Sequence, residues 1–421
     1  TDEAFNKTFA FQWQRKKDNS PVYDWQEFTA SMLSIPMAHQ MATNYIILDG
    51  TPKRQMIKVM RPYQVYAASS IIDKVRQHNF DVDPQEIGYV WHATGSGKTI
   101  SSFKTAWLAS RLPNVDKVVF LVDRVALTNQ TVDEYSAYDP EKAEDGSGGV
   151  VTDASNRWVL SRKIRAKGNG IIVTSLQKMA ALVKDKKDIS NISKKHILFI
   201  VDEAHRSTSG DMLQSIKTAF PKSAWVGYTG TPVFDGHSTT RKIFGDLIHA
   251  YTIVDAIRDN NVLGFKVDFE TTLSDEVLKK QYLPAYFKAR YTKYTDKQIQ
   301  DRINNLKPED MDDMIEPSVY DNNQKHVELV VKDVLKNWDK RSRNGEYNAL
   351  FTTHVGGMKP STPMAMMFYR EFKKQNQLRD KPLKIGITFS MDNSNGDNQL
   401  DNNDSLVEAI HDYNVQFGTN F

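Results

Sequence analysis

The eight residues HATGSGKT, at positions 92–99, stand between two stretches of different character. IGYVW (87–91), which precedes them, is a short apolar run typical of a buried strand, whereas ISSFKTAWLASRL, which follows, has the length and composition of a helix. A glycine-rich turn between a strand and a helix aims backbone N–H groups at a polyphosphate, and the helix dipole adds to the attraction. This stretch therefore predicts a phosphate-binding loop.

The residue types in the loop fit ATP with Mg²⁺. The glycines allow close approach of the backbone, Lys98 has the charge to neutralise the β- and γ-phosphates, and Thr99 offers a hydroxyl to Mg²⁺. The strict pattern has glycine where His92 stands, but this is the least constrained position of the loop. A chance glycine-rich turn is the alternative interpretation. The residues predicted to bind ATP here are Thr94, Gly95, Ser96, Gly97, Lys98 and Thr99.

Similar apolar runs recur along the chain and alternate with segments of helical length, such as RVALTNQTVDEYSAY. Short apolar strands that alternate with amphipathic helices indicate a parallel sheet with helices on both faces. We therefore predict an α/β domain over residues 61–260, in which the phosphate loop follows one of the strands. The predicted strands are IGYVW, KVVFLVD (117–123), GIIVTS (170–175), ILFIVD (197–202) and AWVGYTG (224–230).

The stretch VDEAH, at positions 201–205, places two carboxylates directly after one of these strands. Ligands gather at the carboxyl ends of parallel strands, so we expect this pair near the phosphate loop. Asp202 is predicted to hold Mg²⁺ through water, and Glu203 to orient and deprotonate the attacking water. Together with Lys98 they form the predicted catalytic set. A solvated acidic turn is the alternative.

The rest of the chain divides by composition. Residues 1–60 mix aromatic and charged residues without a clean period, apart from a strand-like YIILD (45–49), and we interpret them as the remnant of an upstream domain with a linker. Charged helical composition dominates residues 261–345 and predicts a helical connector or insertion. Residues 346–421 predict the start of a second, truncated α/β unit. Its strand-like runs are NALFTTHV (348–355) and KIGITFS (384–390).

Composition narrows the class of protein. The chain has 421 residues, of which 40% are hydrophobic and 25% charged, so two or three folded domains are expected. No apolar run approaches a membrane span and the first residues do not resemble a signal peptide, so we predict a cytoplasmic protein without a membrane partner. Zero cysteines exclude thiolate metal sites and disulfides. Because the chain opens on Thr1 and ends on GTNF, we expect a fragment of a larger protein.

The three stretches HATGSGKT, VDEAH and YTGTP (228–232) stand in the order and spacing of superfamily 2 helicases and translocases, which this chain resembles. The resemblance implies a motor of two RecA-like domains that clamp ATP, the first complete and the second partial here. It also implies that Gln64 in RPYQ reads adenine, as a glutamine amide can; a helix-surface amide is the alternative. His205, Thr229 and Thr231 are implied to couple nucleotide state to motion, although His205 is alternatively a local capping or core residue.

Longer stretches are similar to the motor (restriction) subunit of type I restriction-modification enzymes. They are RPYQVYAA, VVFLVDRVALTNQ, IIVTSLQKM, DEAHRS, YTGTPVF, FGDLIHAYTIVDAIRDNNVL and LVEAIHDYNVQF. The resemblance implies a double-stranded DNA translocase that works with modification and specificity subunits and couples stalled translocation to DNA cleavage.

Two departures limit what this resemblance implies. The family carries an N-terminal nuclease with an Asp and a Glu-x-Lys metal site, and residues 1–60 show no such constellation. Its second motor domain also supplies late arginines, and the sequence stops before them. Because such an arginine is worth roughly 10³–10⁵ in rate in other nucleotide hydrolases, the chain alone is expected to bind ATP but to turn it over feebly.

The same resemblance implies contacts with the DNA backbone on the sheet edge opposite the nucleotide. Hydroxyl, amide and cationic groups that bind phosphate carry no sequence information, which suits a motor that walks over any DNA. For each of them an ordinary loop residue is the alternative, and Arg124 alternatively pairs with Asp123 or a neighbouring carboxylate. The predicted DNA-binding residues are Arg124, Thr128, Gln130, Thr174, Gln177, Lys178, Thr352 and Thr353.

Two other functions remain open from the sequence. One is a different superfamily 2 motor, such as an RNA helicase or a chromatin-remodelling ATPase, which stimulation by RNA or by duplex DNA would separate. The other is an ATP-binding interaction module without net catalysis, which would bind nucleotide without DNA-stimulated turnover.

Overall fold

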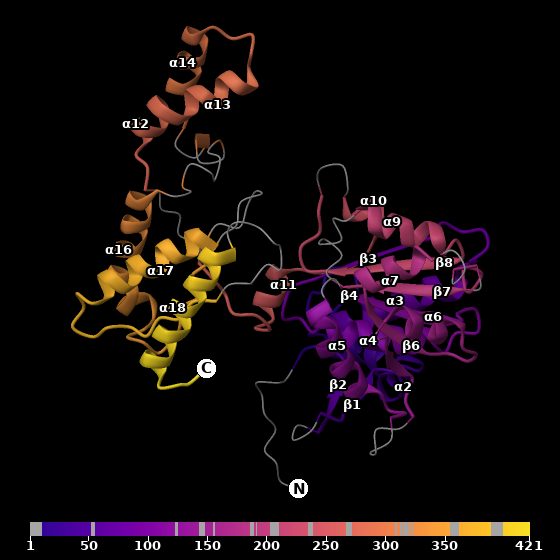
Figure 1. The fold of residues 1–421 in the computed structure, drawn as a ribbon. Coiled ribbons are helices and arrows are strands. Elements are labelled where there is room, and N and C mark those ends of the chain that lie inside the picture. The colour runs from indigo at the N-terminus through magenta and orange to yellow at the C-terminus, as the bar shows by residue number, and fades with distance from the viewer. Residues whose placement is uncertain are drawn as a thin grey trace. The chain divides into compact units, whose positions relative to one another are not determined.

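The structure is a computed structural model in which the chain forms two compact units, Thr1–Phe265 and Lys266–Phe421 (Figure 1). The residues that the structure describes are 11–51, 55–122, 125–142, 148–154, 156–185, 189–190, 192–202, 210–234, 239–266, 272–307, 310–311, 314, 320, 323–353, 362–388 and 399–421.

A seven-stranded sheet forms the centre of the first unit. All its ladders are parallel and its strand order is β5-β6-β4-β7-β8-β3-β9. This arrangement confirms the predicted α/β fold with a parallel sheet. The strands are β3 (Glu86–His92), β4 (Lys117–Val122), β5 (Val151–Asp153), β6 (Ile171–Ser175), β7 (Ile197–Val201), β8 (Ser223–Thr229) and β9 (Leu247–Tyr251).

The alternation of side chains along β4 explains why both faces of the sheet are covered. Phe120 packs into one hydrophobic core and its neighbours Val119 and Leu121 pack into another. Because successive side chains of a strand point to opposite faces, a run that is apolar at every position needs helices on both sides. The first core includes side chains of α3 (Pro62–Gln77), α4 (Lys98–Ala109) and α5 (Val125–Tyr138).

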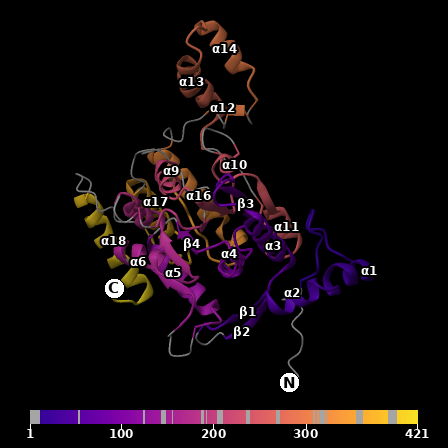
Figure 2. The same cartoon turned by 90° about the vertical axis from the view of Figure 1, so that its right-hand side faces the viewer.

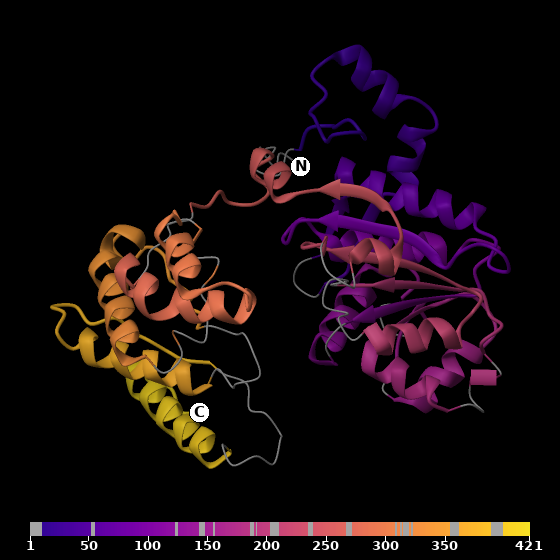
Figure 3. The same cartoon turned by 90° about the horizontal axis from the view of Figure 1, so that it is seen from above.

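Four further helices cover the opposite face. They are α6 (Arg157–Arg165), α7 (Leu176–Val183), α9 (Gly210–Ala219) and α10 (Thr240–Phe244), and each contributes to the second core. Figure 3 shows the two helical layers of the first unit, indigo on one side of the sheet and magenta on the other. The last helix of this unit is α11 (Ile253–Arg258), which follows β9.

The N-terminal elements belong to this first unit. They are α1 (Trp25–Phe28), a π-helical turn (Thr29–Leu33), α2 (Met37–Thr43) and the antiparallel hairpin of β1 (Ile46–Asp49) and β2 (Met56–Val59), which lie along one side in Figure 2. Strand β1 coincides with the predicted YIILD. Lys104 of α4 donates to the carbonyl oxygen of Ile46 at 2.9 Å, which joins the hairpin to the helix after the phosphate loop.

The second unit is helical in its described part, as the composition of residues 261–345 predicts. One small core joins α13 (Leu283–Arg290) to α14 (Asp296–Asn304), and another joins α16 (Gln324–Arg341) to α17 (Thr362–Asn376). The remaining elements are α12 (Asp275–Val277), a π-helical turn (Leu278–Tyr282) and α18 (Gln399–Phe417).

The strands predicted at 348–355 and 384–390 are not formed in the described residues 348–353 and 384–388. A strand needs a neighbouring strand for its backbone groups. In the second unit a side chain takes that place, because the Gln416 amide accepts from the N–H of Ile385 at 2.9 Å and donates to its carbonyl oxygen at 3.2 Å.

Within the described residues, no helix combines the length and the apolar character that crossing a membrane requires.

Candidate functional site

The sequence predicted to bind phosphate forms a tight loop between β3 and α4. Gly95 and Gly97 have φ values of 82° and 80°, in the left-handed region that favours glycine. A Cβ at position 97 would lie 2.6 Å from Nε2 of Gln64, so this glycine is also needed for space. Lys98 and Thr99, both partly exposed, form the first turn of α4, whose N-terminus faces the loop.

Two neighbouring side chains of α3 hold the loop from beneath. The carbonyl oxygen of Ser96 accepts hydrogen bonds from the Tyr63 hydroxyl at 2.6 Å and from Gln64 Nε2 at 2.9 Å. The other end of the Gln64 amide accepts from the backbone N–H of Arg61 at 2.9 Å. Gln64 is therefore buried under the loop with both ends of its amide bonded to backbone. Adenine recognition by Gln64 stays a prediction, and it requires these bonds to be shared or exchanged.

The other two motifs reach the same edge of the sheet. Asp202 follows β7 directly, is half-buried, and donates its backbone N–H to the carbonyl oxygen of Leu121 at 3.0 Å. The loop after β8 touches the phosphate loop, because the Trp91 indole donates to the Gly230 carbonyl oxygen at 3.1 Å and a Cβ at Gly230 would lie 3.1 Å from the Thr94 hydroxyl.

Two of the predicted site residues, Glu203 and His205, lie outside the described residues. Thr229 ends β8 and Thr231 follows it: Thr229 is buried, and its hydroxyl accepts from the N–H of the exposed Thr231 at 3.1 Å. The catalytic, metal-binding and coupling roles of these residues stay predictions.

His92, where the strict loop pattern has glycine, is fully buried. Its Nε2 is hydrogen-bonded to Nδ1 of His249 on β9 at 3.2 Å, and its ring meets Tyr63 edge-on. Burial holds the pKa of His92 well below its usual value, and the charges of His249 and Lys98 act in the same direction. Burial also lowers the pKa of His249 to about 4. The pair is therefore neutral near pH 7 and serves as a packed support behind the loop.

The family model described as SWI2/SNF2 ATPase matches residues 63–300, more than half of the 421-residue chain. The chain belongs to the SWI2/SNF2 ATPase family. A second family model, type I restriction enzyme subunit R domain 3, matches residues 345–421.

Curated relatives of this SWI2/SNF2 ATPase are restriction subunits. The type I restriction enzyme SauCOLORF180P endonuclease subunit of Staphylococcus aureus (strain COL) is 33% identical over 430 residues, which cover 100% of this chain and 41% of the relative. The C-terminal part of the putative type I restriction enzyme MpnIIP endonuclease subunit of Mycoplasma pneumoniae is 39% identical over 170 residues, which cover 38% of this chain and 79% of the relative. These matches confirm the resemblance to type I motor subunits.

The chain spans about two fifths of the length of the Staphylococcus relative. A solved structure, the ATP-dependent Type ISP restriction-modification enzyme LlaBIII bound to DNA, aligns over 78% of this chain and 23% of its own, at 15% identity and a TM-score of 0.43.

The structure distributes the predicted DNA-binding residues of this SWI2/SNF2 ATPase over different environments. Thr128 and Thr174 are fully buried, so neither side chain is at the surface where DNA would pass. Thr174 is the fourth residue of β6, and Thr128 lies in the first turn of α5. Gln177 and Thr352 are exposed, and Arg124 lies outside the described residues.

Of the remaining three residues, Gln130 is exposed and the other two are half-buried. Gln130 bonds Glu134 on the same helix at 3.2 Å, and Thr353 is half-buried. The ammonium group of the half-buried Lys178 donates to the carbonyl oxygen of Ala154 at 3.0 Å. In the first unit, these candidates follow β4 and β6. Both strands end at the same carboxyl edge as β3, separated from it by β7 and β8, so the expected position on the edge opposite the nucleotide is corrected to a position beside it.

Sequence reasoning missed the aromatic support of the phosphate loop. Tyr63 stands directly before Gln64 in RPYQ, and Tyr251 and Asn261 belong to the stretch HAYTIVDAIRDNNVL. Both stretches belong to those that resemble type I motor subunits, and the aromatic and amide side chains inside them are the signal that the sequence offers. What the sequence could not reveal is that the rings of Tyr63 and Tyr251 stack, with centroids 3.6 Å apart.

Proposed function

We propose that the chain is the ATP-driven motor part of a type I restriction endonuclease subunit and that it moves along double-stranded DNA. The observation that supports this most is the meeting of three motifs at one edge of a parallel sheet. The phosphate loop after β3, Asp202 after β7 and the loop after β8 lie together in a chain of the SWI2/SNF2 ATPase family. A sheet edge of this kind is where ligands bind in parallel α/β folds.

The residues present fit ATP with Mg²⁺. The loop has two left-handed glycines, a lysine and a threonine that open a helix, and a Cβ would fill its tightest point. In the proposed complex Lys98 contacts the β- and γ-phosphates, while Thr99 and Asp202 hold the metal. Bound Mg²⁺ would supply charge neutralisation on the transferred phosphoryl group. Glu203 orients the attacking water and accepts its proton, and Gln64 contacts adenine.

The remaining parts of the proposal concern DNA and partners. Residues after β4 and β6 would contact backbone phosphates on the same edge of the sheet, beside the nucleotide. Modification and specificity subunits would choose the target, and coupling to DNA cleavage would belong to the complete subunit. Thr229, Thr231 and His205 would relay the nucleotide state.

The test is steady-state ATPase activity with linear duplex DNA, with single-stranded RNA and without nucleic acid. It is made on this chain and on a longer form that continues past residue 421. We expect duplex DNA to stimulate hydrolysis, more strongly in the longer form, because arginines from a second lobe are expected to reach the γ-phosphate. Lys98→Ala should lower the rate on the order of 100-fold or more, since it removes a preorganised charge from the phosphates.

Lys194→Ala is the matched control. Lys194 is an exposed lysine in the turn before β7, at the amino end of the same sheet, so its loss should leave the rate within about twofold. Stimulation by RNA in place of duplex DNA would replace the proposal with an RNA helicase. Lys98-dependent ATP binding without stimulation by any nucleic acid, in both forms, would replace it with an interaction module.

A further inference from the structure

An aromatic cluster links the phosphate loop to distant parts of the first unit. Tyr63, which donates to Ser96, is fully buried and stacks on Tyr251 of β9 at an interplanar angle of 7°. Ala93 of the phosphate loop packs into the same small core, with Phe11 at its border. The loop therefore rests on side chains that come from α3, from β9 and from the N-terminal segment.

The bonds from Tyr63 and Gln64 also orient one N–H group of the loop, that of Gly97. A trans peptide is planar, with its carbonyl oxygen and its N–H on opposite sides. Since the Ser96 carbonyl oxygen points inward to Tyr63 and Gln64, the N–H of Gly97 points the opposite way, out of the protein interior. That is the direction from which an anion approaches the start of α4. Tyr63 is thus a positioning residue for a phosphate-binding N–H.

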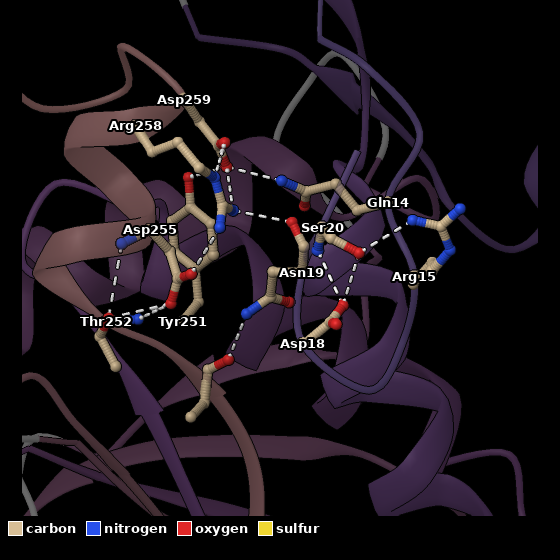
Figure 4. Close-up of polar contacts among 11 residues, drawn as sticks. Gln14, Arg15, Asp18, Asn19, Ser20, Tyr251, Thr252, Asp255, Arg258 and Asp259 are labelled. Carbon is tan, nitrogen blue, oxygen red and sulfur yellow. Dashed lines mark hydrogen bonds and ion pairs between the residues drawn. The ribbon is translucent and has the colours of Figure 1, made fainter. Parts of the chain in front are cut away.

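The stack continues to a buried carboxylate at the end of α11. The Tyr251 hydroxyl donates to Oδ2 of Asp259 at 2.9 Å, and Nε2 of Gln14 donates to the same oxygen at 2.6 Å (Figure 4). The Asp259 side chain is only 7% exposed, and its other oxygen accepts from Arg258 Nε at 3.0 Å. One carboxylate therefore joins the aromatic pair to a residue 245 positions away in the sequence.

Gln14 belongs to a short N-terminal hairpin, residues 13–22, which closes on itself through backbone bonds such as Val22 N–H to the Trp13 carbonyl oxygen at 2.8 Å. The hairpin is attached to β9 and α11 at a second point. Asn19 donates to the Ala250 carbonyl oxygen and accepts from Arg258 through its own carbonyl oxygen, both at 2.7 Å (Figure 4).

The turn after α11 contacts both Tyr63 and the phosphate loop. Nδ2 of Asn261 donates to the Tyr63 hydroxyl at 3.2 Å, and its Oδ1 accepts from Arg61. Val262 lies next, 3.7 Å from the position of a Cβ at Gly95. Asp259, Asn261 and Val262 therefore connect the hairpin, Tyr63 and the phosphate loop within four residues of chain.

We propose that the N-terminal hairpin and the ATP site are coupled through Asp259, Tyr251 and Tyr63, so that nucleotide binding and docking of residues 13–22 favour one another. The inference rests on the proposed function only in that the phosphate loop binds ATP. Coupling of this kind is reciprocal: if the docked hairpin strengthens ATP binding, ATP strengthens docking by the same factor. Docking of the hairpin then regulates the ATP site, and a protein that displaces the hairpin would weaken ATP binding.

The experiment measures backbone amide exchange of residues 13–22 and the affinity for ATP with Mg²⁺, on the chain and its variants. Saturating ATP should slow hairpin exchange about threefold to tenfold in the unmodified chain. Gln14→Ala removes the bond to Asp259 and leaves the site itself intact. Its affinity should fall about threefold to tenfold, the weight of one hydrogen bond, and the ATP-dependent protection should disappear.

Arg15→Ala is the matched control, because Arg15 is the next residue of the same hairpin but bonds Glu27 instead of Asp259. Its other side-chain bond in Figure 4 goes to Ser20. It should change neither quantity. Tyr63→Phe keeps the stacked ring and removes only the hydroxyl, and it should abolish the protection as well. In the double variant Gln14→Ala/Tyr63→Phe the affinity losses should fall short of the sum, since both break one path.

Two results would overturn the coupling while ATP binding stands. One is unchanged hairpin exchange when ATP protects the phosphate loop. The other is wild-type ATP affinity in Gln14→Ala, even if its melting temperature falls, which would reduce the hairpin to a structural part. Absence of Lys98-dependent ATP binding would instead overturn the proposed function and this inference together, whereas ATP binding without DNA stimulation leaves the inference in place.

Discussion

Two segments of this chain have nearly the same pattern and different structures. EIGYV (86–90) opens β3, whereas KIGIT (384–388) in the second unit is not a strand. Strand β3 lies between β8 and β9 and pairs with both. The backbone of Ile385 has the Gln416 amide as its partner instead. An apolar run therefore forms a strand only where neighbouring strands complete its backbone hydrogen bonds.

The glycines of the two segments also differ in how closely other parts of the chain approach them. A Cβ at Gly88, whose φ is 143°, would lie 2.5 Å from the carbonyl oxygen of Asp246 and from a side-chain carbon of Ile248. A Cβ at Gly386 would lie 3.3 Å from the ring of Tyr413. This distance is slightly shorter than an ordinary van der Waals contact, and a small shift of the Tyr413 side chain can relieve it. Glycine is therefore required at position 88, where the backbone of a neighbouring strand passes close. At position 386, where the neighbour is a side chain of a helix, a larger residue can be accommodated.

Substitution of these two glycines should change the free energy of unfolding by very different amounts. Gly88→Ala should lower the free energy of unfolding of the first unit by about 3 kcal/mol or more, because it combines a glycine-only backbone conformation with overlap against backbone atoms. Gly386→Ala, the matched substitution, should cost about 1 kcal/mol or less. Urea unfolding, followed by amide exchange in each unit, measures both. Equal losses would show that the neighbouring strand is not what constrains Gly88.

Much of the first unit could be predicted from its sequence. The runs ending at Trp91, Asp123, Ser175, Asp202 and Gly230 became β3, β4, β6, β7 and β8, because continuous apolar stretches have few stable alternatives in a parallel sheet. Strands β5 and β9 were not predicted. They form the two edges of the sheet and are only partly buried, so their sequences carry a weaker apolar signal.

The loops of the candidate site could be predicted from the sequence, whereas the buried side chains that hold these loops in place could not. Residues 92–99 and Asp202 stand at strand ends, and strand ends of a parallel sheet meet by topology alone. Tyr63, His249 and Asp259 act through contacts between segments more than 150 residues apart, or through a stack that no spacing reveals. The same limitation applies to Thr128 and Thr174, whose burial depends on how helices cover the strand ends.

A second, smaller effect concerns how β9 is held against β3. His92 and His249 are buried and neutral, and burial depresses the pKa of both. The unfolded chain takes up protons below pH 6.5, whereas the folded chain resists this until the pH approaches 4 at His249. Stability of the first unit should therefore fall as the pH falls from 6.5 towards 4, by about 1.4 kcal/mol per pH unit for each histidine.

The measurement is urea unfolding between pH 7 and pH 4.5, followed by the amide exchange of β3. Carboxylates also titrate near the lower limit, so the diagnostic quantity is the difference between the unmodified chain and His249→Gln. In this variant the slope of the free energy of unfolding against pH should be smaller by about 1.4 kcal/mol per pH unit, the contribution of one proton. A slope that His249→Gln leaves unchanged would mean that the histidine pair does not set the acid sensitivity of this strand pair. His411→Gln in the second unit should have no effect on β3.

The last prediction concerns Gln416, whose side chain bonds the backbone of Ile385 where a neighbouring strand would otherwise do so. Gln416→Ala removes both partners of the Ile385 backbone, and because this residue is only half-buried, water can take up the lost bonds. We expect a loss of about 1 kcal/mol in the second unit and faster exchange of the Ile385 amide. Gln300→Ala, which removes an exposed glutamine from α14, is the control and should leave that amide unchanged. If Ile385 exchanges equally slowly without Gln416, its N–H has another partner, and the difference between the two segments does not rest on that side chain.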